Sequence, residues 1–173
     1  RIRIELMRAR LVILISVCLM GLQSCKVNYS FTGASVTPGV NTISIQTFPS
    51  YAPQGPPTLS QVFSETLKDI FLTQTNLTLV KDNGDLMMEG EITGYQVQSE
   101  AISDDRATTN KLTITVKVRY TDTKDDSKSF EQTFSNFAQF DANQQLSAVE
   151  DQLIEEINEQ LTQDIFNKAL GSW

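Results

Sequence analysis

One cysteine carries the most specific chemical signal in this chain. Leu22-Gln23-Ser24-Cys25 has the pattern of a lipobox, at which a bacterial signal peptidase cleaves and lipid is attached to the cysteine thiol. Upstream, Met7-Arg8-Ala9-Arg10 supplies a start residue and a basic segment. The uncharged run over residues 11–22 spans about 18 Å as a helix, which is shorter than the ~30 Å hydrocarbon core of a bilayer. A secretory signal therefore fits better than a transmembrane helix, and we predict a lipid anchor at Cys25.

The predicted anchor divides the chain into three parts. Residues 1–24 are a start-site extension and signal peptide that is removed, residues 25–33 are a lipidated tether, and residues 34–173 are a single domain. The mature part keeps roughly 150 residues, which is enough for one domain with a buried core. The alternative, an ordinary secretory signal with a chance cysteine, would leave the same domain without an anchor.

Missing residue types restrict the chemistry of this domain. The sequence has no histidine, and its two cysteines, Cys18 and Cys25, lie in the signal peptide and at the acylation position. The domain therefore lacks a thiolate nucleophile, Cys or His zinc ligands and the commonest general base. Its net charge of about −10 after signal removal would also repel nucleic acid. We expect no enzyme activity, no metal, no cofactor and no nucleic-acid partner.

Three basic residues are the strongest candidates for ligand binding. Lys111, Lys117 and Arg119 share the polar side of a strand predicted over residues 111–121. Their ammonium and guanidinium groups suit phosphate oxygens. The same groups can equally form ion pairs with carboxylates on neighbouring strands. The candidate partners there are Glu89, Glu91 and Glu131. Both interpretations are open, and we favour charge pairing.

Three pairs of adjacent carboxylates raise the question of a metal or acid–base site. The pairs are Asp104-Asp105, Asp125-Asp126 and Glu155-Glu156. None has the spacing of an EF-hand loop, and adjacent carboxylates in turns are usually solvated. We therefore predict no metal or catalytic site at these positions.

Two amphipathic helices must position these side chains. Apolar stripes at helical period predict the first over residues 59–71 and the second over residues 146–170, with Gly171 at its end. Both have capping-box spacing near their first residues, at Thr58 and Gln61 and at Ser147 and Glu150. A proline-rich loop over residues 49–57, which contains Tyr51, either docks a partner or only connects a strand to the first helix.

The other elements are strands. Alternation and turn signals place them over residues 42–48, 77–80, 86–99, 111–121 and 129–140. Gly90 and Gly94 indicate a bulge or a strong twist in the third strand. The order predicts an α+β fold, a two-layer sandwich with a largely antiparallel or mixed sheet of about four to five strands covered on one face by two α-helices.

Several segments together resemble a known family. They are Tyr29 to Ser35, Asn41 to Pro49, Thr58 to Gln61, Gly84-Asp85-Leu86, Glu89 to Tyr95 and Asp164 to Ala169. These strings resemble the LptE family, the lipopolysaccharide-assembly lipoproteins of Gram-negative outer membranes. The similarity covers nearly the whole mature chain and includes no catalytic signature.

The resemblance implies a non-catalytic role in lipopolysaccharide transport. LptE-like proteins plug the β-barrel protein LptD, help it to assemble and pass lipopolysaccharide to the outer leaflet. Some members bind lipopolysaccharide themselves. On this basis Lys111, Lys117 and Arg119 are candidate ligands of the lipid A phosphates, although no functional residue of the family can be matched by motif.

The residues after the cysteine predict the location. Lys26 stands where an aspartate would favour retention in the inner membrane, and residues 27–31 lack the acidic cluster that favours surface display. We therefore expect a lipid-anchored protein on the periplasmic side of the outer membrane. The alternative function is a periplasmic lipoprotein that scaffolds or activates a cell-wall synthase or a secretion channel.

Overall fold

The computed structural model describes residues 36–100 and 109–171. The signal peptide, Cys25, the tether and residues 101–108 lie outside these ranges, so the predictions made for them stay predictions. The described residues belong to one compact unit. In chain order their elements are β1 (Thr42–Ile45), α2 (Leu59–Gln74), β2 (Thr78–Val80), β3 (Leu86–Glu100), β4 (Thr109–Asp122), the 3-10 helix η1 (Asp126–Lys128), β5 (Phe130–Asp141) and α3 (Leu146–Leu170).

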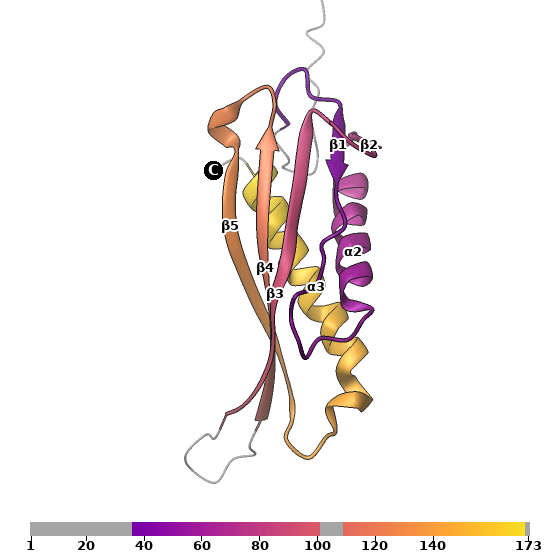
Figure 1. Cartoon of the computed structure of the whole chain (residues 1–173), viewed down its shortest axis with the longest axis vertical. Coiled ribbons are helices and arrows are strands. Elements are labelled where there is room, and N and C mark those ends of the chain that lie inside the picture. Colours follow the sequence, from indigo (N-terminus) through magenta and orange to yellow (C-terminus); the bar gives the residue numbers. More distant parts are fainter. Residues whose placement is uncertain (1–35, 101–108, 172–173) are drawn as a thin grey trace, which may run out of the picture. The chain divides into compact units, whose positions relative to one another are not determined.

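The strands form one mixed sheet in the order β2-β1-β3-β4-β5. β3, β4 and β5 are antiparallel, whereas β1 is parallel to both of its neighbours. Both helices lie on the same side of the sheet (Figure 1). This arrangement confirms the predicted α+β two-layer sandwich. The part of the sheet that departs from a simple antiparallel meander is β1-α2-β2, where a helix connects two parallel strands.

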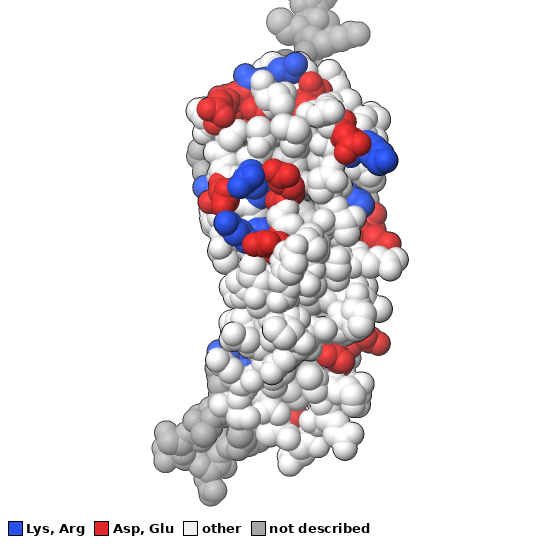
Figure 2. Space-filling view, viewed as in Figure 1, with Lys and Arg blue, Asp and Glu red and all other residues white. Residues whose placement is uncertain are grey.

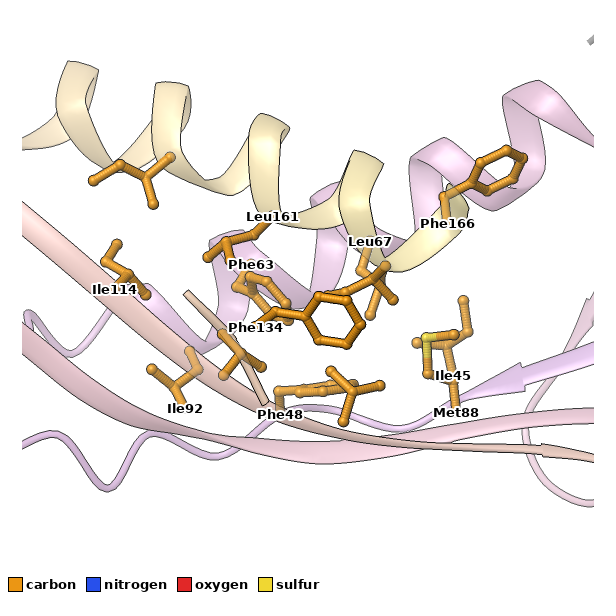
Figure 3. Close-up of a cluster of buried hydrophobic side chains, with 14 of the residues drawn as sticks. Ile45, Phe48, Phe63, Leu67, Met88, Ile92, Ile114, Phe134, Leu161 and Phe166 are labelled. Atoms are coloured by element: carbon orange, nitrogen blue, oxygen red, sulfur yellow. The ribbon is translucent and has the colours of Figure 1, made fainter. Parts of the chain in front are cut away.

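The core lies between the sheet and the two helices. Alternate residues of β4 are buried, namely Leu112, Ile114, Val116, Val118 and Tyr120. Figure 3 shows Ile114 of β4 and Phe134 of β5 directed toward Phe63 of α2 and Leu161 of α3. Edge-to-face ring pairs, at centroid distances of 5.2 Å for Phe48 with Phe63 and 5.1 Å for Phe71 with Phe166, add directional packing.

The predicted capping box of α2 is wrong. Thr58 does precede the helix, but its backbone is already helical and its side chain makes no capping hydrogen bond. The amide of Gln61 instead donates to Glu65, one turn ahead, over 3.0 Å. The apolar stripe, and not the cap, therefore fixes the position of this helix.

The predicted capping box of α3 is also wrong. Gln145 precedes the helix, and no side chain caps it. Glu150 accepts a hydrogen bond from the hydroxyl of Tyr95 on β3. Burial of Tyr95 and the neighbouring carboxylate raise the pKa of that phenol. Glu150 thus fixes the start of α3 to the sheet.

The proline-rich connection after β1 follows the sheet. Gln46 donates its backbone N–H to the carbonyl of Met88 over 2.9 Å. Further along, the N–H of Tyr51 donates to Ile92, and the N–H of Ile92 donates to Pro49, both over 2.9 Å. β1 is therefore shorter than the predicted strand. Beyond β1, isolated backbone hydrogen bonds hold the chain against β3.

A polar junction joins the ends of β1, β3 and β4. The carboxylate of Asp85 accepts hydrogen bonds from the N–H groups of Asn41 and Thr42, over 3.0 and 3.1 Å, and from the hydroxyl of Thr42 over 2.8 Å. These bonds, led by the one from Asn41, lower the pKa of Asp85 to about 2. Buried Asp122 accepts a hydrogen bond from the hydroxyl of Thr37 over 2.6 Å. The segment before β1 is thereby fixed to the end of β4.

Two glycines of β3 have different structural roles. The register between β3 and β4 shifts between Ile92 and Gly94, which confirms the predicted bulge. At Gly90, a Cβ atom would lie 2.1 Å from the carbonyl oxygen of Lys117 and 2.5 Å from the ring of Phe48. The Phe48 ring thus occupies the space that a side chain at Gly90 would need.

We expect Gly90→Ala to destabilise the domain far more than Gly94→Ala. The first substitution forces β4 and Phe48 apart, which should cost about 3 kcal/mol, whereas the second meets only the side chain of Thr115 and should cost about 1 kcal/mol or less. Urea unfolding followed by circular dichroism measures both values. Equal midpoints for the two variants would contradict the proposed packing of Phe48 on Gly90.

Candidate functional site on the open face of the sheet

The face of the sheet that neither helix covers, here called the open face, carries the candidate residues. Figure 2 presents this face in the orientation of Figure 1, with charged side chains gathered in its upper half. Strand pairing places Arg119 between Glu89 and Glu131, and Lys117 between Glu91 and Thr133. Because side chains alternate along a strand, all of these residues lie on the same face.

Five residues form a charge cluster: Glu89, Glu91, Lys117, Arg119 and Glu131. Lys117 Nζ lies 2.6 Å from Glu131 Oε1, and Arg119 Nη2 lies 2.9 Å from Glu131 Oε2. Arg119 Nη1 also lies 3.4 Å from Glu89 Oε1. The structure thus contains the pairing that we favoured from sequence, with Glu131 at its centre. Whether the same cations bind a ligand stays a prediction.

The pairing changes the proton affinity of the paired groups. The hydrogen bond from Lys117, followed by that from Arg119, lowers the pKa of the Glu131 carboxyl below its usual range. Hydrogen bonding and the negative charge of Glu131, with a further contribution from Glu89, raise the pKa of Arg119. Both shifts favour the charged forms of Glu131 and Arg119.

A shallow pocket opens beside the cluster. Its volume is about 370 Å³, and its lining combines the cluster with Gln46, Thr47 and Gly90. The lining has three carboxylates and two cations, so it is slightly acidic. An anion would have to displace Glu131 from Lys117 and Arg119, whereas a neutral polar ligand could use the carboxylates as acceptors.

Lys111 does not join the cluster. It lies six residues before Lys117 on β4, which corresponds to about 20 Å along an extended strand. Its ammonium group lies 5.0 Å from the ring centroid of Phe137 on β5, within the range of a cation–π contact. The three candidate residues therefore lie in two places. Lys117 and Arg119 belong to the charge cluster, whereas Lys111 lies beside the ring of Phe137.

Between and beside these two places lies a set of uncharged side chains, here called the neutral band, that sequence reasoning missed. Strand register and alternation place on the open face Gln96, Gln98, Thr113, Thr115, Thr133, Ser135, Phe137 and Gln139. The ninth member is Thr93 at the bulge, whose hydroxyl donates to the carbonyl of Thr115 over 3.4 Å. Phe137 stands out because 48% of its surface is exposed. Its odd-numbered position, opposite in parity to the buried Phe134, was the signal that could have identified it.

The remaining candidate sites lie elsewhere or lack the geometry. Asp125 caps the turn of η1, where its carboxylate accepts hydrogen bonds from the N–H and hydroxyl of Ser127. Within residues 36–100 and 109–171, no three His, Cys, Asp or Glu side chains are grouped as metal ligands would be. No helix in the same ranges is both long enough and apolar enough to cross a bilayer. Asp104-Asp105 lies outside the described residues.

Comparison with known proteins identifies one family. The model of the LptE family, described as lipopolysaccharide-assembly, matches residues 40–169. The match therefore runs from Val40, two residues before β1, almost to the end of α3. The sequence matches none of the curated proteins.

Solved structures with a similar fold have low sequence identity. A hypothetical protein from Chlamydia trachomatis is 12% identical, with a TM-score of 0.50 over 72% of this chain and 93% of that chain. A protein from Xanthomonas campestris is 8% identical, with a TM-score of 0.51 over 79% of this chain and 90% of that chain. A minor lipoprotein from Acinetobacter baumannii is 16% identical, with a TM-score of 0.49 over 75% and 91% of the two chains. At these identities the first two similarities concern the fold alone.

We expect the Glu131 carboxyl to titrate below the ordinary glutamate value of 4.5. Lys117→Met should raise its midpoint, because the larger of the two cationic hydrogen bonds is lost while Arg119 remains. Carboxyl carbon chemical shifts followed against pH by NMR measure this midpoint. Lys111→Met is the matched control and should leave it unchanged, so an equal effect of both variants would contradict the geometry of the cluster.

Proposed function

The chain belongs to the LptE, or lipopolysaccharide-assembly, family, and from this membership we propose that it is a non-catalytic outer-membrane lipoprotein that plugs and helps to assemble an LptD-type β-barrel. In this role it aids the insertion of lipopolysaccharide at the cell surface. The observation that carries the proposal is the family match over residues 40–169, which includes every strand and helix of the described fold except the last residue of α3, Leu170.

The anchor and the residue types agree with this proposal. A lipid on Cys25 would hold the domain on the periplasmic side of the outer membrane, since acyl chains contribute ~0.8 kcal/mol for each buried methylene. A domain without histidine, and without cysteine apart from the acylated one, suits a role that depends on binding rather than on catalysis.

The cations of the open face are candidate contacts to lipopolysaccharide. Lys117 and Arg119 lie side by side and have exposed fractions of 47% and 57%. A lipid A phosphate could take the place of Glu131 as their partner, because phosphate oxygens accept the same charge-assisted hydrogen bonds. Lys111 would contact the same molecule only at a second point, because it lies apart from the other two.

We expect an LptD-type barrel to copurify with this protein in near-equal amount. The mature chain would be isolated by a C-terminal tag from detergent-solubilised outer membranes, and its partners identified by mass spectrometry. The matched control carries the same signal peptide and tether fused to an unrelated soluble domain, and should not retain the barrel. Recovery of a peptidoglycan synthase or a secretion channel in place of the barrel would support the scaffold or activator function and overturn our proposal.

We expect Lys117→Ala combined with Arg119→Ala to weaken lipopolysaccharide binding roughly tenfold, because two charge-assisted contacts to phosphate are lost. Affinity for purified lipopolysaccharide would be measured in detergent micelles. Lys68→Ala combined with Lys81→Ala changes the net charge equally on other parts of the domain and serves as the control. Glu131→Gln should strengthen binding, since it frees both cations. Unchanged affinity in the folded Lys117 and Arg119 variant would exclude these residues as ligands.

A further inference from the structure

We propose that the neutral band binds the saccharide portion of lipopolysaccharide, with the ring of Phe137 as the surface on which a sugar ring packs. This inference rests on the proposed function and assigns its ligand a second contact, separate from the lipid A phosphates. Figure 2 shows few charged side chains on the lower half of the open face.

The first argument is the chemistry of the band. Its polar side chains are hydroxyls and amides, which both donate and accept hydrogen bonds as sugar hydroxyls do. The nine residues of the band are uncharged, although Lys111 on the same face pairs with both Gln98 and Gln139. A neutral surface also loses less solvation free energy than a charged one when a neutral ligand covers it.

The second argument is the placement of Phe137. The ring is held on a regular strand, directly opposite Thr113 of β4, and almost half of its surface is exposed. Large aromatic rings bury much apolar surface with little loss of conformational freedom, and the apolar C–H face of a pyranose ring can pack on such a ring. Lys111 Nζ lies over the ring, 5.0 Å from its centroid, so a sugar would pack on the part of the ring that the ammonium group does not cover.

The third argument is the shortage of apolar surface for a protein partner. The core of a protein interface usually contains several aromatic or other apolar side chains. On the described part of the band, Phe137 is the one large hydrophobic residue that is strongly exposed. Val97 is also exposed, but it pairs with buried Leu112 and so belongs to the helix side of the sheet. One aromatic ring among polar groups fits a saccharide better than a protein.

The fourth argument is continuity with the charge cluster. Thr133 pairs directly with Lys117 across β4 and β5, and the hydroxyls of Thr115 and Ser135 come next, 3.1 Å apart. From Lys117 to Thr113, opposite Phe137, the strand advances about 13 Å. One glycolipid could therefore place its phosphates at the cluster and its sugars along the band.

The test separates the parts of lipopolysaccharide. The mature chain in detergent micelles would be titrated with three probes and followed by NMR: intact lipopolysaccharide, lipid A alone, and the lipid-free saccharide after enzymatic removal of its phosphates. We expect the phosphate-free saccharide to bind, with amide shifts concentrated in β4 and β5 around Thr113 and Phe137.

Variants then test the contact itself. Phe137→Ala should weaken binding of the saccharide at least fivefold, and Thr113→Val, of almost the same shape, should weaken it less. Tyr51→Ala removes another exposed aromatic residue, 66% exposed, from outside the band and should have no effect. Lys117→Ala with Arg119→Ala should leave binding of this phosphate-free probe unchanged.

Two results would overturn the inference. One is that only lipid A and intact lipopolysaccharide bind, and the other is that Phe137→Ala binds the saccharide as well as the unmodified protein does. In either case the proposed function survives if the barrel still copurifies. Loss of the barrel with retained saccharide binding would instead reject the proposed function and keep the band as a saccharide site.

Discussion

The alternation of β4 is the constraint on which the rest of the structure depends. This strand lies between β3 and β5 and pairs with both of them along almost its whole length. Its even-numbered side chains from Leu112 to Tyr120 are buried beneath the helices. A slip of one residue would exchange the two faces, exposing the apolar set and burying Lys117 and Arg119. The packing of the core therefore also fixes where the candidate ligands lie.

The register of β1 needs a fixed point of its own, because β1 is parallel to β3 and is not joined to it by a tight turn. The polar junction supplies this point. Asp85, just before β3, accepts hydrogen bonds from the first residues of β1, while Asp122 at the end of β4 holds Thr37. Charge-assisted bonds from backbone N–H groups are directional, so they align the strand ends more closely than apolar contacts alone. With β1 aligned in this way, the chain just beyond it brings Gln46 and Thr47 to the pocket.

The sequence predicted the features that depend on local periodicity. The helical stripes, the alternation of β4 and the bulge at Gly94 all follow from the spacing of side chains within one element. The features that it did not predict depend on distant residues. Glu150 has the spacing of a cap but pairs with Tyr95, and the parallel placement of β1 is set by a crossover through α2. The parity of Phe137 places its ring on the open face, but the alternation within β5 does not indicate what an exposed ring binds.

The two faces of the sheet contribute differently to stability and to function. The charge cluster is exposed to water, and ion pairs in such positions contribute little to folding because solvent screens them. The fold is held by the buried face, so the residues of the open face are not needed to keep the domain together. The cluster nevertheless keeps Glu131 between two cations, in a place where a phosphate could replace it. Beside it, the nine uncharged residues of the neutral band share the open face with Lys111, and the packing of the core does not require this composition. Such a division between charged and neutral surface is what a ligand with both charged and neutral parts requires.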